Sequence, residues 1–290
     1  MIENKVPVTY RSTFGEKLVR PYAITLDAQG NLYVTESFGG KVSKFDENGN
    51  LLLRFGDGEG GMFRKNGRLR QPAGIALDNT GTMYVADFRL NQVYRYDSQG
   101  HCLGSFGSHG KGDGQFNHCL GVRIDPEGYL VVADQENDRL QKFDLQGNFR
   151  SKLGKHGSDA RGQGFFDHPT DLAYDADGCL FVVDEGNARV QKFDPRGNFM
   201  FKFGKAGSEK GQFSSPHGIA IDGQGRIYVT DANRDEILVF NSYGRYLYSF
   251  WGPIQVGGSL FRPIGIAIGN QGKIYIADSR NNRIMVFSID

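Results

Sequence analysis

Short apolar runs alternate with polar, glycine-rich turns along the whole chain. Residues 180–204 show this pattern most fully. Leu180–Val183 is apolar and rich in β-branched residues, whereas Arg189–Phe193 and Phe199–Phe203 alternate between apolar and polar side chains. Turn-rich segments separate the three runs, a pattern typical of short β-strands joined by tight turns.

The same pattern returns six times. An acidic residue marks one position in every copy, and successive copies are 47 to 51 residues apart. These residues are Glu36, Asp87, Asp134, Asp184, Asp231 and Asp278. Each follows a proline or cysteine by fifteen residues and precedes an aromatic residue by nine. A fixed period of this length indicates a repeat protein in which each copy is one structural unit.

Each unit predicts four strands, exemplified by Gly218–Ile221, Ile227–Thr230, Ile237–Phe240 and Tyr246–Phe250. The last unit ends after its third strand, and Tyr10–Phe14 resembles a fourth strand with no unit before it. If this N-terminal strand completes the last unit, the array closes and leaves no open edge. The sequence therefore predicts one all-β domain over 1–290, a six-bladed β-propeller of four-stranded antiparallel blades.

The turns indicate which face carries function. Asp-x-x-Gly or a close variant, as in DAQGN at 27–31 and DPRGN at 194–198, recurs after the first and third strands of the units. The Asp side chain accepts backbone N–H groups, and glycine adopts the positive φ that such a turn needs. The loops on the opposite face are irregular, so we expect any binding site there and at the mouth of the central channel.

Charge and composition limit the location and the partners. Lys and Arg number 34 and Asp and Glu number 33, which gives a net charge of +1 and no global attraction to nucleic acid or membrane. No apolar run is long enough to span a membrane, and the first residues do not resemble a signal peptide. Cys102, Cys119 and Cys179 lack metal-binding spacing and suggest free thiols in a reducing compartment. We expect a cytoplasmic monomer.

A family resemblance follows from the repeat. The pattern G-Q-F-x-x-P-x-G-I-A-I-D of Gly211–Asp222, with the I-Y-I-A-D-S-R-N-N-R-I-M-V-F of Ile274–Phe287, resembles the NHL-repeat family along essentially the whole chain. The resemblance implies a propeller fold and several functions. These are protein or RNA binding, as at the end of tripartite-motif proteins, unknown roles in bacterial propellers, and the activity of peptidyl-α-hydroxyglycine α-amidating lyase. The chain shows no RING, B-box or coiled coil.

The lyase resemblance implies a zinc ion bound by three histidines that follow the repeat prolines. Only His217 fits, because the equivalent residues are Tyr22, Ala73, Leu120, Thr170 and Ile264. A catalytic zinc needs three protein ligands, so we expect no metal, no other cofactor and no catalytic residue. A different site from His118, His168 and His217 is an open alternative, as is the interpretation that they bond to loop carbonyls or water.

Departures from the repeat suggest where a ligand binds. Arg123 replaces the Ala or Thr that faces the channel in the other inner strands, and Asp171 replaces a Gly or Ala in the next unit. The two side chains either form an ion pair that fills the channel or hold a small polar ligand between them. With the residues around each repeat proline, the predicted channel-mouth site comprises Arg20, Tyr22, His118, Arg123, His168, Asp171, His217 and Arg262.

A basic loop offers a second site. Arg64, Lys65, Arg68 and Arg70 lie in one loop between units, and Arg89 follows a neighbouring strand. Such a patch binds phosphate groups, but Asp57, Glu59 and other acidic residues share its face. The leading hypothesis is therefore a non-enzymatic module that binds a protein or peptide at the mouth. RNA binding through loop 64–70 and a metal-dependent lyase or hydrolase are the alternatives.

Overall fold

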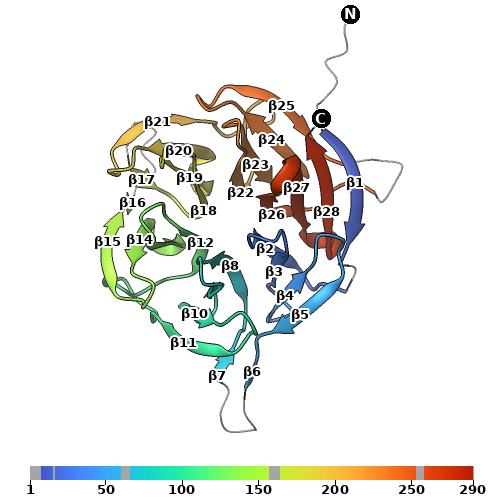
Figure 1. Ribbon diagram of the computed structural model, residues 1–290. Helices are drawn as coiled ribbons and strands as arrows, with labels where there is room; N and C mark the ends of the chain where they lie inside the picture. The colour runs from blue at the N-terminus through green and yellow to red at the C-terminus, as the bar shows by residue number, and fades with distance from the viewer. Residues whose placement is uncertain (1–7, 16, 60–65, 157–163, 253–257, 290) are drawn as a thin grey trace, which may run out of the picture.

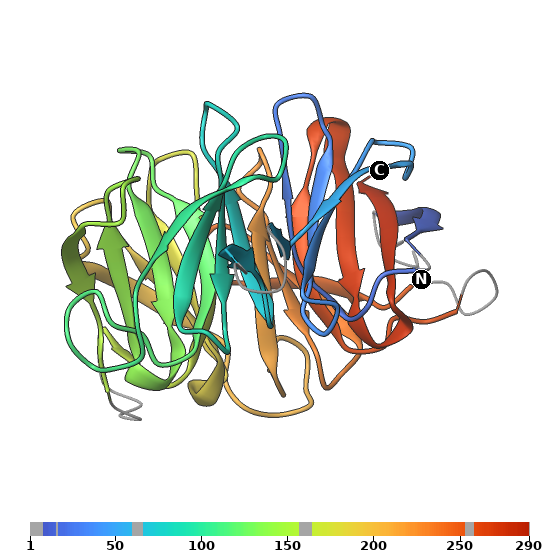
Figure 2. The ribbon, with the colours of Figure 1, turned by 90° about the horizontal axis from the view of Figure 1, so that it is seen from below.

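The computed structural model describes residues 8–15, 17–59, 66–156, 164–252 and 258–289. Six four-stranded antiparallel sheets surround a central axis as the blades of a propeller (Figure 1). Seen from the edge, the ring is a disc with turns and loops at both faces (Figure 2). The predicted fold class is confirmed.

The blades follow one another along the chain, each from its inner strand to its outer strand. Blade 1 contains β2 (Pro21–Leu26), β3 (Leu32–Glu36), β4 (Lys41–Phe45) and β5 (Leu51–Phe55). Blade 2 contains β8 (Pro72–Leu77), β9 (Met83–Asp87), β10 (Gln92–Tyr96) and β11 (Cys102–Phe106). Blade 3 contains β12 (Cys119–Ile124), β13 (Leu130–Asp134), β14 (Arg139–Phe143) and β15 (Phe149–Leu153).

The second half repeats this order. Blade 4 contains β18 (Pro169–Tyr174), β19 (Leu180–Asp184), β20 (Arg189–Phe193) and β21 (Phe199–Phe203). Blade 5 contains β22 (Pro216–Ile221), β23 (Ile227–Asp231), β24 (Glu236–Phe240) and β25 (Tyr246–Phe250). Blade 6 contains β26 (Pro263–Ile268), β27 (Lys273–Asp278), β28 (Arg283–Ile289) and, as its outer strand, β1 (Val8–Phe14).

Short elements complete the chain. Two small pairings lie between blades, formed by β6 (Asp57–Glu59) with β7 (Asn66–Arg68) and by β16 (Lys155–His156) with β17 (Phe165–Phe166). Four short 3-10 turns are η1 (Gln135–Asn137), η2 (Glu185–Asn187), η3 (Asn270–Gly272) and η4 (Ser279–Asn281).

Strand β1 closes the ring as the sequence predicts. It pairs antiparallel with β28, from Val8 opposite Ile289 to Phe14 opposite Ile284, with a bulge after Tyr10. The N-terminal strand and the C-terminal strand therefore lie side by side in one sheet (Figure 1). This pairing covers the outer edge of β28, which would otherwise expose unpaired backbone groups.

The predicted turn chemistry is also present. Asp27 Oδ1 accepts the backbone N–H groups of Gln29 and Asn31 at 3.1 and 2.9 Å, and Gly30 has a φ of 83°. Hydrophobic residues gather in six clusters, each between two neighbouring blades. We call each of these blade interfaces a seam. The core is thus divided among six seams, one between each pair of neighbouring blades.

Candidate functional site at the channel mouth

The irregular face is built from two kinds of chain segment. In every blade the inner strand begins where the second strand ends, because the two are antiparallel. The residues before each repeat proline therefore lie beside the loops that follow the second strands. This topology brings the predicted channel-mouth residues from all parts of the chain onto one face.

At four of these residues, a hydrogen bond to the preceding blade holds the backbone. Arg20, His118, His168 and Arg262 have φ values of 55°, 62°, 53° and 55°, in the left-handed region that such residues rarely adopt. Each donates its backbone N–H, at 2.7 to 2.9 Å, to a side-chain oxygen of the preceding blade. The acceptors are Asn282, Asn91, Asp138 and Asp235, respectively.

Blades 2 and 5 lack this bond for a simple reason. The acceptor positions of the preceding blades are filled by Gly40 and Ala188, which have no side-chain oxygen. There the N–H groups of Gln71 and Ser215 bond instead to the acidic residue of their own blade. These bonds between blades were not predicted, although the Asn or Asp four residues after the repeat acid is a signal for them in the sequence.

One side of the mouth is basic. Arg20 of blade 1 lies close to Arg262 and Arg280 of blade 6, and burial together with these two charges lowers the pKa of Arg20. None of the three guanidinium groups forms a salt bridge with another described residue. Arg20 also lies 6.0 Å from the ring centre of Phe38, which is 74% exposed. These three cations, here called the arginine trio, are held together in spite of their repulsion.

The other side of the mouth is acidic and carries two histidines. His168 Nδ1 lies 2.5 Å from Asp167 Oδ1, and its Nε2 lies 3.4 Å from Glu136 Oε1. His118 stacks on Phe88 with ring centres 4.0 Å apart, and its Nδ1 lies 3.8 Å from the same Glu136 oxygen. We call Glu136, Asp138 and Asp167 the acidic trio.

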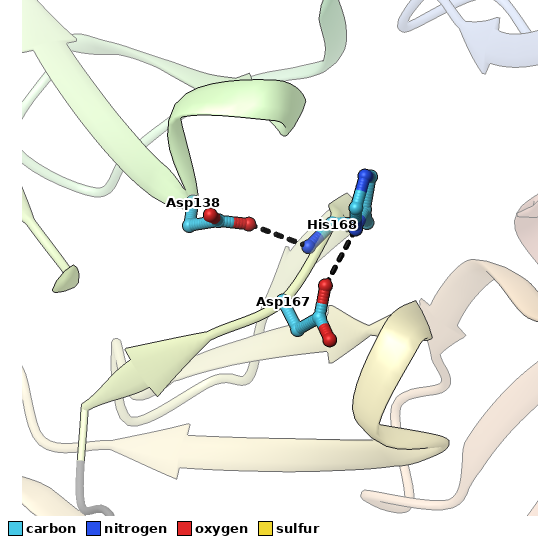
Figure 3. A group of neighbouring side chains, drawn as sticks. All are labelled: Asp138, Asp167 and His168. Atoms are coloured by element: carbon cyan, nitrogen blue, oxygen red, sulfur yellow. Dashed lines mark hydrogen bonds and ion pairs between the residues drawn. The ribbon is translucent and has the colours of Figure 1, made fainter. Parts of the chain in front are cut away.

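Asp138, Asp167 and His168 bring three ligand-type atoms within 4.8 Å of one another (Figure 3). Both carboxylates already accept hydrogen bonds from His168, one from its backbone N–H and one from its ring. The cluster therefore has a structural explanation without a metal ion. Among the residues that the structure describes, His118, His168 and His217 do not come close enough together to bind one metal ion.

His168 should make stability depend on pH. Burial opposes its charge, but the hydrogen bond to Asp167 and the charges of Glu136 and Asp138 prevail and raise its pKa above the ordinary 6.5. A histidine whose folded-state pKa is raised stabilises the fold fully below about pH 6.5 and loses this contribution as pH rises through the folded value. In urea unfolding, His168→Gln should therefore be most destabilising near pH 5.5. Equal losses at pH 5.5 and 8.5 would contradict this assignment.

The floor of the mouth is aromatic. The rings of Tyr22 and His217, from blades 1 and 5, meet edge to face with centres 6.2 Å apart. Burial and the nearby Arg262 lower the pKa of His217 to about 4, so this imidazole is neutral at pH 7. Burial also raises the pKa of Tyr22. The floor is thus an uncharged surface between the arginine trio and the acidic trio.

Below this floor the channel is nearly filled. Arg123 Nη2 bonds to Asp171 Oδ2 at 2.9 Å, which is the ion pair that the sequence offered as one of two alternatives. The remaining cavity is about 20 Å³ and is lined by Tyr22, Thr170, Asp171, His217 and small residues. Its walls approach closely, since a β-carbon on Gly265 would lie 2.2 Å from the Tyr22 carbonyl oxygen. This cavity, at the level of Tyr22 and His217, has room for about one water molecule.

The predicted nucleic-acid residues lie outside the mouth. Arg68, Arg70 and Arg89 line one cavity of about 550 Å³ together with Phe38 and Asp57. Asp57 pairs with Lys41 at 3.1 Å, and Arg89 bonds to Gln71 at 3.2 Å. Arg64 and Lys65 lie outside the described residues. The structure therefore brings three of the five predicted cations together.

Comparisons with known families agree with this architecture. Residues 170–256 match a family model described as a six-bladed β-propeller, and residues 262–287 match that of the NHL repeat. The last part of the chain thus carries an NHL repeat within a six-bladed propeller. No curated protein is significantly similar to this chain in sequence. Within its described residues, no helix has the length and apolar character needed to cross a membrane.

Solved structures resemble this propeller in fold. A streptogramin B lyase shares 14% identity at a TM-score of 0.68, with 99% of this chain and 100% of that chain covered. A virginiamycin B lyase from Staphylococcus aureus, with quinupristin, shares 16% identity at a TM-score of 0.64, covering 94% and 82%. A gluconolactonase from Xanthomonas campestris shares 16% at a TM-score of 0.66, covering 97% and 86%. At these identities the likeness concerns the fold alone.

Proposed function

We propose that this protein is a non-enzymatic recognition module that binds a segment of a partner protein across the channel mouth. The observation that carries the proposal is the separation of charge on the irregular face. The arginine trio belongs to blades 6 and 1, and the acidic trio belongs to blades 3 and 4 or the loop between them. These blades lie on opposite sides of the ring (Figure 1).

A segment of protein suits this arrangement better than a uniformly charged polymer. An anionic group, such as an acidic side chain or a terminal carboxylate, pairs with the arginine trio, since Arg binds carboxylates with two parallel hydrogen bonds. A cationic side chain pairs with Glu136 and Asp167 on the far side. Tyr22 and His217 provide an uncharged aromatic floor for the residues between, and exposed Phe38 and Phe261 flank the basic side.

The ion pair in the channel and the histidine positions support binding without catalysis. Arg123 and Asp171 neutralise each other, and His217 is the only histidine at the position that the lyase resemblance requires. No described group of ligand atoms at the mouth combines the three histidines that a metal-dependent reaction would use. The mouth therefore offers a shallow, charged surface to a ligand that stays outside.

The test is selection of peptides from a random library displayed with free C-termini. We expect enriched peptides that carry an acidic residue or the terminal carboxylate at one end and Lys or Arg several residues away. A triple variant, Arg20→Glu, Arg262→Glu and Arg280→Glu, should weaken their binding at least about 100-fold, because each anionic contact becomes a repulsion. Isothermal titration calorimetry measures the loss.

The matched control changes three exposed arginines on the regular face. Arg150→Glu, Arg196→Glu and Arg245→Glu alter the net charge by the same amount and should leave peptide affinity unchanged. Failure to enrich any peptide, or equal losses in the two triple variants, would reject the proposal.

Single-stranded RNA is a second candidate, favoured by the cavity of Arg68, Arg70 and Arg89. An exposed aromatic ring, Phe38, lines the same cavity and offers a surface on which a base stacks. RNA binding there predicts a steep fall of affinity with salt and a loss in Arg68→Glu. Peptide binding at the mouth predicts that Arg68→Glu has no effect.

A further inference from the structure

Five of the six seams contain the same pair of aromatic rings. One ring comes from near the start of the second strand, three residues before the repeat acid, and the other from the end of the fourth strand of the same blade. The five pairs are Tyr33 with Phe55, Tyr84 with Phe106, Phe181 with Phe203, Tyr228 with Phe250, and Tyr275 with Phe14. The seam between blades 3 and 4 has Val131 and Leu153 instead. Two departures from the repeat thus converge on one seam.

The fourth-strand phenylalanine normally lies over the turn glycine of the next blade. A β-carbon added to Gly49, Gly100, Gly147 or Gly244 would lie no more than 2.8 Å from such a ring. The same atom on Gly197 would lie 4.0 Å from the nearest side-chain atom, Leu153 Cδ1. The space that a phenyl ring fills at the other turns is therefore open above Gly197.

A cavity of about 520 Å³ occupies this seam. Val131, Leu140, Leu153, Leu180 and Tyr174 form its apolar walls. Tyr174 occupies the position at which the other inner strands end in Leu or Ile, and its larger side chain fills part of the space left by the two missing rings. The rim contains exposed residues, among them Lys152, Asp177 and Arg196, and the cavity therefore reaches solvent on the regular face.

Polar groups at the cavity differ in their availability. Lys142 bonds to Asp125 and Glu127, both at 2.7 Å, and Lys152 bonds to Asp113 at 2.7 Å. The Tyr174 hydroxyl, in contrast, has no hydrogen-bond partner among the described residues. Apolar walls with an unbonded tyrosine hydroxyl match the usual composition of a small-molecule site, and the volume lies within the usual range of roughly 300–1,000 Å³.

We infer that the seam between blades 3 and 4 is a binding site for a small aromatic molecule with a polar substituent. The aromatic ring takes the place that rings of the protein occupy in the other five seams, between Val131, Leu153 and Gly197. The polar substituent bonds to the Tyr174 hydroxyl. This site is on the regular face, so it is independent of the recognition proposed at the channel mouth.

The experiment uses phenol and indole as probes and a variant that restores the repeat. Val131→Tyr with Leu153→Phe installs the pair found in the other seams. Both probes should bind the native protein in saturation-transfer NMR, and the double variant should lose at least about tenfold in affinity, since its own rings fill the site. The variant should also melt at a higher temperature than the native protein, because a cavity has been filled.

Leu153→Phe alone provides a second variant if the double change prevents folding, which circular dichroism would reveal. It should weaken both probes while Arg245→Glu, on the same face in blade 5, leaves binding unchanged. Absence of probe binding to the native protein at millimolar concentration would overturn the inference. Equal binding to native and folded filled variants would overturn it as well.

Discussion

Deletion of residues 1–14 should lower the free energy of unfolding by at least about 4 kcal/mol, because a strand's hydrogen bonds and its packing are lost together. Strand β1 pairs with β28 along its length, and the Tyr10 and Phe287 ring centres are 5.8 Å apart. Phe14 packs against Phe45 of blade 1 at 5.3 Å. The deletion therefore opens both the last blade and the seam between blades 6 and 1.

Urea unfolding followed by circular dichroism measures the loss, and deletion of residues 1–7 is the matched control because it leaves β1 in place. The shorter deletion should unfold at nearly the native urea concentration. The longer deletion should also aggregate with rising protein concentration, since β28 becomes an exposed edge. Coincident unfolding curves for the two truncations would show that β1 does not close the ring.

The closed ring was predictable because the same turn and strand patterns recur in every unit of the sequence. Asp27 and its equivalents open tight turns through side-chain acceptors, and the strands between them alternate in a way that any one copy shows. The complementary ends of the chain, Tyr10–Phe14 and a last unit with three strands, required one further step of argument. Local pattern and global topology agreed, so few alternatives remained.

The candidate site was harder to predict because it depends on which blades are neighbours. Arg20 and Arg280 are 260 positions apart in the sequence, and only the closure of the ring, which packs blade 1 on blade 6, places them together. The sequence predicted a mixed field for the irregular face, and farther from the mouth Asp57 does lie beside Lys41. At the mouth itself, the arginine trio and the acidic trio lie on opposite sides of the ring (Figure 1). The positions of His118 and His168 depend on bonds from the preceding blade, which the repeat pattern of a single unit does not contain.

The open seam illustrates a different limit. Val131 and Leu153 are ordinary strand residues when each is compared with its own neighbours in the sequence. Their effect appears only when both are aligned with the five aromatic pairs and both are placed in the same seam. Either substitution alone would not indicate a cavity, whereas the two together in one seam do.

Asp184→Ala should be the most damaging single substitution of a polar residue in blade 4, costing about 3–5 kcal/mol of stability. Asp184 is fully buried, and its carboxylate lies 2.6 Å from Nε of Arg189, which is 4% exposed. It also accepts hydrogen bonds from Asn187, Gln191 and the Asp167 backbone. Removing the carboxylate leaves a buried guanidinium without its charge partner and several donors without an acceptor.

Two further variants separate the charge effect from a general intolerance of change. Asp194→Ala removes a turn acid of the same blade whose bonds are exposed, and it should destabilise the protein far less than Asp184→Ala. Asp184→Ala with Arg189→Met removes the stranded charge and should recover part of the loss seen with Asp184→Ala alone. Urea unfolding of the three variants decides the matter. If the double variant is no more stable than Asp184→Ala, the cost arises from the lost loop hydrogen bonds, which both variants lack, and not from the unpaired arginine.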